Sequence, residues 1–93
     1  LARAVVDISG RIALSYDVHP RVEKVGDFDT ELFPEFFKAF ADNARLNLHL
    51  DLLKSSNGHH DIEAVFKAFA RAMAGACRFD TRVEGQHSSK GSL

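Results

Sequence analysis

Alternating apolar and polar positions predict strands in the first quarter of the chain. Residues 1–8 form an apolar run rich in Val, which is typical of a strand. Ser9 and Gly10 supply turn chemistry, and residues 12–18 then alternate apolar and polar side chains with a period of two. We therefore expect these two strands to pair as a hairpin. Residues 21–25 fit a short third strand.

The pattern then changes to the helical period. Residues 31–44 place apolar side chains at helical spacing, and Asp29 or Thr30 fits the N-cap. Residues 46–52 alternate strictly, which predicts a strand with its four leucines on one face. Residues 59–77 fit a second helix, whose apolar stripe consists of Ile62, Val65, Phe66, Phe69 and Met73.

The order of these elements predicts the fold class. The sequence gives β-β-(β)-α-β-α, and each element has one apolar face or stripe. Such elements favour an α/β (α+β) fold, a two-layer sandwich with both helices on one face of a mostly antiparallel or mixed sheet. Residues 78–93 are polar and without period, which is typical of a terminus with no stable structure of its own.

Length and composition narrow the classes of function. The 93 residues suffice for one small domain. The net charge of -1 gives no basic surplus for nucleic acid, and no apolar run approaches the ~20 residues of a membrane span. We expect neither a nucleic acid nor a membrane as partner. The single cysteine fits a reducing, cytoplasmic location. Since the chain opens without Met inside an apolar run, we expect part of a longer protein.

The sharpest chemical feature is the HHxxE pattern of His59, His60 and Glu63, followed by Lys67. Because each helical residue turns by about 100°, these four polar groups fall within roughly 100° of one helix face. Two imidazoles and a carboxylate are reasonable ligands for a divalent metal, and a helix N-terminus favours an anionic substrate. Taken alone, a doubled His near a helix start is more often an exposed polar cap.

Other polar residues give weaker signals. His49, on the polar side of its strand, is more often a surface histidine than a ligand, and neither His19 nor His87 has a partner visible in the sequence. The tail residues Ser88, Ser89, Lys90 and Gly91 offer hydroxyls and a cation that could wrap a phosphate. The same composition is usual in a flexible terminus.

Several segments together resemble the imidazoleglycerol-phosphate dehydratase family. They follow the family's order and spacing over nearly all of the chain, and the HHxxEAxFKA block combined with the terminal SSKG is specific. The match is to the second half of the family's sequence only, so residues 1–93 would be a single half-domain. The matching segments are residues 7–11, 25–32, 36–37, 48–50, 57–64, 66–68 and 88–91.

The resemblance implies a metal-dependent lyase. Members dehydrate imidazole glycerol phosphate to imidazole acetol phosphate in histidine biosynthesis. They use manganese (Mn2+), and they form large symmetric oligomers with sites built from both halves at subunit boundaries. By the resemblance, His59, His60 and Glu63 are metal ligands, and Glu63 is also a candidate for proton transfer.

The resemblance also implies a phosphate site. Arg11 and Lys67 match substrate and phosphate contacts, and Ser88, Ser89 and Lys90 lie in the tail that closes on the phosphate. The implied partners are a small phosphate substrate and either a complementary N-terminal half or further copies of this chain.

Some positions depart from the family pattern. Glu35 stands where many members have a ligating His, and a carboxylate can still bind manganese. Ile12, Ser55 and His87 also differ from the usual residues. A second hypothesis is therefore a non-catalytic scaffold or self-assembling module that keeps the fold without the chemistry. An unrelated metal-binding α/β module would leave Arg11 and the SSKG tail unexplained.

Overall fold

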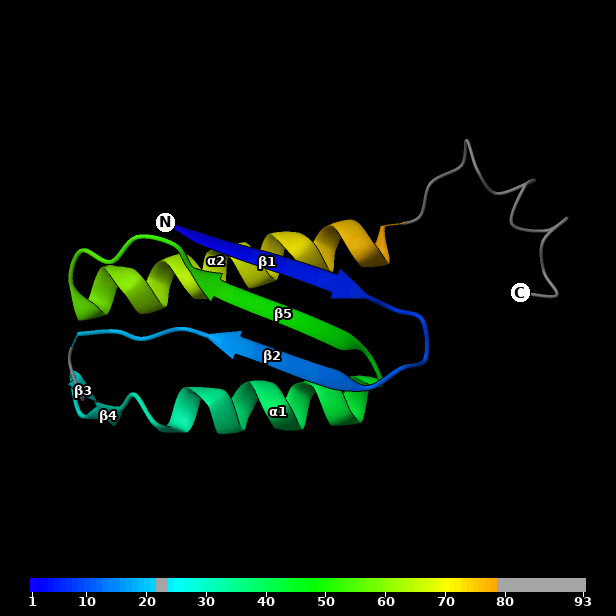
Figure 1. The fold of residues 1–93 in the computed structure, drawn as a ribbon, viewed down its shortest axis with the longest axis horizontal. Helices are drawn as coiled ribbons and strands as arrows, with labels where there is room; N and C mark the ends of the chain where they lie inside the picture. The colour runs from blue at the N-terminus through cyan, green and yellow to red at the C-terminus, as the bar shows by residue number, and fades with distance from the viewer. Residues whose placement is uncertain (22–23, 79–93) are drawn as a thin grey trace, which may run out of the picture.

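The computed structural model describes residues 1–21 and 24–78, and the predicted phosphate-closing residues Ser88, Ser89 and Lys90 lie outside these ranges. Figure 1 shows the elements in chain order. The strands are β1 (Ala2–Asp7), β2 (Ala13–Asp17), β3 (Lys24–Val25), β4 (Phe28–Asp29) and β5 (Asn47–Leu52), and the helices are α1 (Leu32–Ala44) and α2 (Gly58–Cys77).

The main sheet has the strand order β1-β5-β2, so the predicted hairpin is wrong. β5 lies between the two strands that were expected to pair, antiparallel to β1 and parallel to β2. The inner faces explain this order, because Leu48 and Leu50 of β5 are fully buried whereas β1 and β2 bury their side chains only partly. The inner face of β5 carries leucines where β1 has Ala4 and Val6, so the strand with the larger apolar side chains to bury takes the centre of the sheet.

The connections follow from this order. Residues 8–12 cross over the end of β5, a span of about 10 Å for two strand spacings. Gly10 supports this connection with a φ of 88°, a left-handed conformation that glycine adopts readily. β2 and β5 are parallel and therefore need a crossover, which α1 provides.

The predicted third strand is shorter than expected. β3 contains only Lys24 and Val25 within the described residues, and it pairs with β4, which the sequence did not indicate. The turn between them uses Gly26 with a φ of 62°. This small hairpin forms a separate sheet and leads into α1 (Figure 1).

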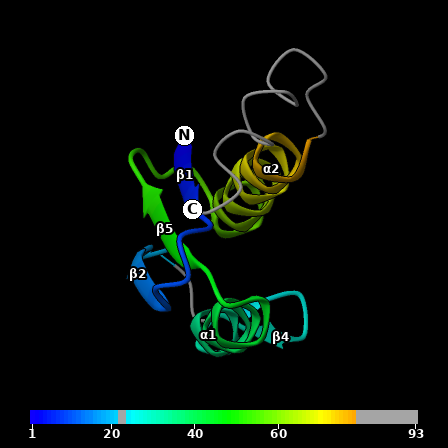
Figure 2. The same cartoon turned by 90° about the vertical axis from the view of Figure 1, so that its right-hand side faces the viewer.

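Both helices cover the same face of the main sheet, as expected. Figure 2 shows the strands as one layer with α1 and α2 side by side on one side of it. α2 packs mainly on β1, and α1 packs on β2. The other face carries alternate polar residues, including His49 and Asp51 of β5. Arg3 Nη2 lies 3.2 Å from the Asp51 carboxylate across the β1–β5 pair. No helix in the described ranges has the length and apolar character needed to cross a membrane.

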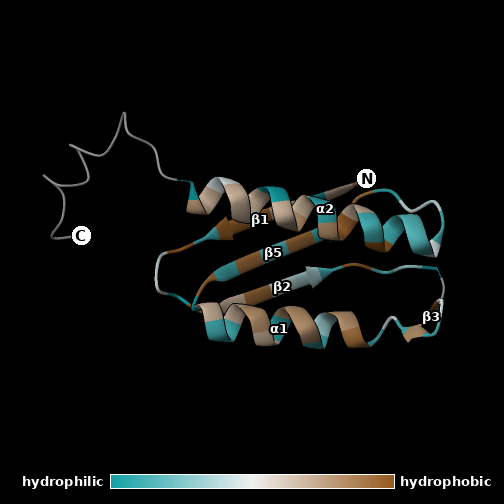
Figure 3. Cartoon of the chain, turned by 180° about the vertical axis from the view of Figure 1, so that it is seen from behind, coloured by the Kyte–Doolittle hydropathy of each residue, from teal (hydrophilic) through white to brown (hydrophobic). Residues whose placement is uncertain are grey.

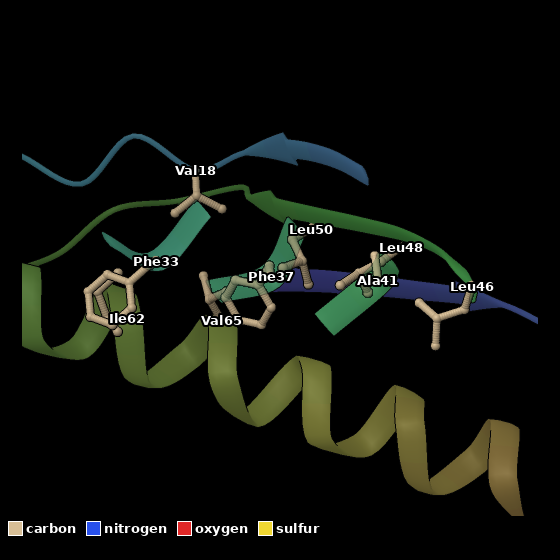
Figure 4. Packing of buried hydrophobic residues seen from close by; sticks show 9 residues of the cluster. All are labelled: Val18, Phe33, Phe37, Ala41, Leu46, Leu48, Leu50, Ile62 and Val65. Carbon is tan, nitrogen blue, oxygen red and sulfur yellow. The ribbon is translucent and has the colours of Figure 1, made fainter. Parts of the chain in front are cut away.

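The core lies between the sheet and the helix pair. Figure 4 shows side chains from β5, α1 and α2 gathered in this layer. Phe37, Leu48 and Leu50 are 0% exposed, so the centre of the layer is dry. The buried cluster consists of Val18, Phe33, Phe37, Ala41, Leu46, Leu48, Leu50, Ile62 and Val65.

The helix starts differ from one another. α1 has Glu31 at its N-cap, without a side-chain hydrogen bond, so the prediction of Asp29 or Thr30 as N-cap is wrong. Asp29 belongs to β4, and its carboxylate accepts the Glu31 N–H at 3.0 Å, two residues before the N-cap of the helix. α2 begins with a complete cap at Asn57, which positions the HHxxE residues.

Candidate functional site at the start of the second helix

The loop between β5 and α2 brings the HHxxE residues to one end of the molecule. Asn57 has extended backbone angles, and its side chain accepts the His60 backbone N–H at 2.9 Å. This is the usual way in which an Asn N-cap satisfies a free helix N–H. The cap fixes the first turn of α2 and thereby the direction in which His59 and His60 project.

A buried carboxylate holds the same loop from the inside. Asp61 is 1% exposed, and its two oxygens accept hydrogen bonds from Ser55 Oγ at 2.5 Å and Ser56 N at 2.8 Å. Burial raises the pKa of the Asp61 carboxyl, but the two hydrogen bonds and nearby positive charges, including Arg21, outweigh it and leave the pKa below its usual value. Asp61 therefore fixes the loop as an ionised acceptor.

Sequence reasoning missed Asp61, although a signal was present. Asp61 lies one helical turn before Val65, a member of the apolar stripe, so it falls on the buried side of α2. A carboxylate on that face requires hydrogen-bond donors, and the preceding loop offers Ser55 and Ser56.

The side chains of His59, Glu63 and Lys67 form a row along the exposed face of α2. His59 Nε2 lies 3.6 Å from Glu63 Oε2, and Lys67 Nζ lies 3.3 Å from Glu63 Oε1. The predicted helical spacing thus brings these three residues together. The hydrogen bond and charge of Lys67 are the main reason that the pKa of Glu63 lies below its usual value, and the two histidines lower it further. Glu63 is therefore a carboxylate at neutral pH.

His60 projects beside this row rather than into it. Its ring centroid lies 5.8 Å from that of His59, and its Nδ1 lies 2.9 Å from the Asn57 amide nitrogen. Both imidazoles are exposed. The ring of His60 is thus held by the N-cap residue and not by Glu63.

The donor set suits a divalent metal only in part. Within residues 1–21 and 24–78, no three His, Cys, Asp or Glu side chains lie close enough to hold an ion together. Among the predicted ligands, His59 Nε2 and Glu63 Oε2 form a close pair 3.6 Å apart, near the roughly 3 Å that separates two ligands about 2.1 Å from one ion at a right angle. Nitrogen and carboxylate oxygen are suitable ligands for such an ion. Glu35 is exposed in the first turn of α1 and does not join them.

The predicted phosphate contacts fall into two groups. Lys67 lies next to Glu63, but Arg11 is exposed in the β1–β2 connection at the opposite end of the sheet (Figure 1). The register confirms this separation, since Asp7 and Ala13 both pair with Asn47, the first residue of β5, while α2 follows its last. Six strand residues extend about 20 Å. Arg11 and His60 therefore cannot contact one small molecule within a single chain.

His19 and His49 are surface residues. His19 had no partner visible in the sequence, and the fold places its Nε2 3.0 Å from Asp17 Oδ1. His49 is exposed on the polar face of the sheet, as predicted. His87 lies outside the described residues.

The helix layer also presents apolar side chains to the outside. Phe36 is 48% exposed and Leu32 is 44% exposed on α1. Phe36, Phe40, Ala39 and Ala44 line a shallow apolar groove with Asn43. Figure 3, seen from the helix side, shows apolar stretches along α1 between polar turns. A surface of this kind is typical of a contact with another protein segment.

The comparisons with known proteins point to one family. The sequence model of imidazoleglycerol-phosphate dehydratase matches residues 1–73. Among curated relatives with that name, the protein from Pelobacter propionicus is 59% identical over 100% of this chain and 48% of its own. The protein from Acinetobacter baylyi is 51% identical, again over 100% of this chain and 46% of its own.

A solved structure gives the same result. The crystal structure of imidazoleglycerol-phosphate dehydratase from Staphylococcus aureus subsp. aureus aligns with a TM-score of 0.74 and 60% identity. The alignment covers 76% of this chain and 42% of that one. The chain spans about half the length of the curated relatives it matches. With this agreement in sequence and in fold, the chain belongs to the imidazoleglycerol-phosphate dehydratase family.

Proposed function

We propose that this chain forms one half of an assembly that dehydrates imidazole glycerol phosphate to imidazole acetol phosphate in histidine biosynthesis, with Mn2+ as cofactor. The observation that carries the proposal is the row of His59, Glu63 and Lys67 on α2 in a chain of this family. A cytoplasmic location remains a prediction from composition.

The metal ligands in this proposal are His59, His60 and Glu63, with Glu35 as a further carboxylate. A bound Mn2+ ion would stabilise negative charge on the substrate's imidazole ring as hydroxide leaves. Glu63 has a lowered pKa, so at neutral pH it can bind a cation or accept a proton but holds no proton to donate. Its place in the reaction is therefore that of a ligand or a base.

The phosphate end of the substrate requires other groups. We assign Lys67 and Arg11 to it, together with Ser88, Ser89 and Lys90 of the tail. Arg11 and the His59–Glu63 pair are a sheet length apart, which supports a site shared between chains. Each site would combine the α2 start of one protein segment with the Arg11 loop of another, either the complementary half or a second copy.

The direct test is reconstitution. The purified chain is mixed with the complementary half of a relative and Mn2+, and the dehydration of imidazole glycerol phosphate is followed. We expect turnover only with both halves present, and a loss of at least about a hundredfold in a His59→Ala variant. Turnover that survives His59→Ala would show that the start of α2 is not part of the active site.

We also propose that the apolar helix layer is a contact with the complementary half or a further copy in a homo-oligomer. The exposed Phe36 and Leu32 support this. Single apolar residues on a surface need no partner, but exposing a groove lined by several of them to water is unfavourable. Phe36→Asp should shift the chain toward smaller species in light scattering. Val5→Asp is the matched control, since Val5 is also 48% exposed but lies on β1 and projects to the polar face of the sheet.

A second candidate function is a non-catalytic assembly module. The observation that favours it is that the described residues bring no three metal-binding side chains together. Manganese content after purification with the complementary half separates the two functions. A stoichiometric metal that is lost in His59→Ala supports the lyase, whereas an assembly that stays metal-free supports the module.

A further inference from the structure

The N-cap of α2 also determines which nitrogen of His60 carries the proton. The Asn57 side chain makes two contacts with the same residue: its Oδ1 accepts the His60 backbone N–H at 2.9 Å, and its Nδ2 lies 2.9 Å from His60 Nδ1. The backbone N–H is always a donor, so the atom that faces it must be the amide oxygen. The atom facing the ring is then the NH2 group, which can only donate.

The orientation of the ring follows. Because Asn57 Nδ2 donates, His60 Nδ1 must accept, and in the neutral ring the proton lies on Nε2. A metal-bound histidine usually has the opposite arrangement, in which one nitrogen binds the ion and the other donates its N–H to a carboxylate or a carbonyl. Asn57 therefore offers His60 the wrong kind of partner for a metal ligand.

We propose that Asn57 is a positioning residue that competes with a metal ion for His60. If the ion binds Nδ1, it needs the lone pair that Asn57 occupies. If it binds Nε2, the proton must move to Nδ1, where it would face the amide NH2. Either route breaks the Asn57 contact, so metal binding at His60 requires this side chain to turn away. The metal part of the inference rests on the proposed function.

Two substitutions separate the ring contact from the helix cap. Asn57→Asp and Asn57→Ser both retain a good N-cap oxygen. Asp replaces the donor at the ring by an acceptor, which favours a proton on Nδ1 and leaves Nε2 free. Ser removes the ring contact without adding charge, so it controls for the attraction between the new carboxylate and a cation.

The first measurement is the ring tautomer in the metal-free chain. Proton–nitrogen correlation spectra of the isotope-labelled chain are recorded at alkaline pH, where imidazole side chains are neutral, and His60→Gln assigns the signals. We expect the His60 proton on Nε2 in the parent chain and on Nδ1 in Asn57→Asp. A proton on Nδ1 in the parent would overturn the proposal.

The second measurement is Mn2+ binding by calorimetry. Since a neutral hydrogen bond shifts an equilibrium roughly two- to tenfold, Asn57→Ser should bind Mn2+ tighter than the parent by that factor, and Asn57→Asp tighter still. Equal or weaker binding by Asn57→Ser would overturn the competition. If no variant binds Mn2+ even in the assembly with the complementary half, the proposed metal function fails, and the tautomer measurement alone then supports or overturns the role of Asn57.

Discussion

Two carboxylates two residues apart on α2 have opposite surroundings. Asp61 points inward and holds the loop through Ser55 and Ser56, whereas Glu63 is exposed between His59 and Lys67. Both have a lowered pKa, Asp61 because hydrogen bonds outweigh its burial and Glu63 because of the neighbouring lysine. Asp61 therefore stabilises the loop at the site, and Glu63 is available to a ligand.

Replacing Lys67 should change the titration of Glu63. In Lys67→Met the hydrogen bond and the charge are both lost, so the pKa of Glu63 should rise towards its ordinary value of 4.5. Carboxyl chemical shifts of the metal-free chain during an acid titration measure this. Arg71→Met, one turn further along α2, is the matched control and should leave the pKa unchanged. An unchanged Glu63 pKa in Lys67→Met would contradict the assignment.

Asp61 should make the stability of the fold depend on pH. Its folded-state pKa lies below the ordinary 3.8, so its contribution is present above that value and is lost as the pH falls through the folded-state pKa. Asp61→Asn should lower the free energy of unfolding by about 1–3 kcal/mol at neutral pH and flatten the acid slope. Urea unfolding of the metal-free chain at several pH values measures both effects. If the unfolding free energy of parent and variant falls with the same slope in acid, the prediction is contradicted.

At the scale of elements, β5 organises the molecule. It separates β1 from β2, pairs with both, and supplies the buried Leu48 and Leu50 to the layer under the helices. Its last residue leads through a short loop into α2, so the position of the HHxxE residues depends on where this strand lies in the sheet. Disturbing β5 should therefore affect both the core and the candidate site.

Substitutions on the two faces of β5 test this. Leu48→Ala should cost about 2–5 kcal/mol of folding free energy, because it leaves a cavity in a fully buried layer. His49→Ala, the next residue and exposed on the opposite face, should change it by less than about 0.5 kcal/mol. Thermal or denaturant unfolding compares them, and similar losses would mean that β5 is not the centre of the core.

At the scale of the whole molecule, the groups assigned to the substrate lie at opposite ends. The six residues of β5 extend about 20 Å, with the Arg11 loop near one end of the sheet and the α2 start near the other. Within a single chain, the groups at these two ends cannot contact the same small substrate. Under the proposed function, activity therefore requires an assembly that places one end against the other.

Mixing two defective chains tests this arrangement. Arg11→Ala and His59→Ala should each be inactive in the reconstituted assembly, because each removes one end of every site. If copies of this chain combine, mixed oligomers of the two variants should recover part of the activity, since some sites then receive an intact Arg11 and an intact His59. Assays before and after mixing measure the recovery. Its absence, with assembly intact, would show that the two ends belong to separate sites or pair only with the complementary half.

The sequence by itself determined the elements and the local part of the site. Periods of two and of 3.6 residues located the three main strands and both helices, because a strand or helix with one buried face needs that period whatever it packs against. The His59–Glu63–Lys67 row was equally predictable, since residues four apart lie on one helix face.

Only the tertiary structure decided how these elements meet. Residues 8–12 fit a hairpin turn as well as a crossover, and the placement of β5 between β1 and β2 depends on competition between strands for the buried centre of the sheet. The partners of Asp61, the contact of Asn57 with the His60 ring and the distance of Arg11 from α2 also depend on the loop path. Spacing along a chain fixes neighbours within one element, but contacts between elements form only when a common core is packed.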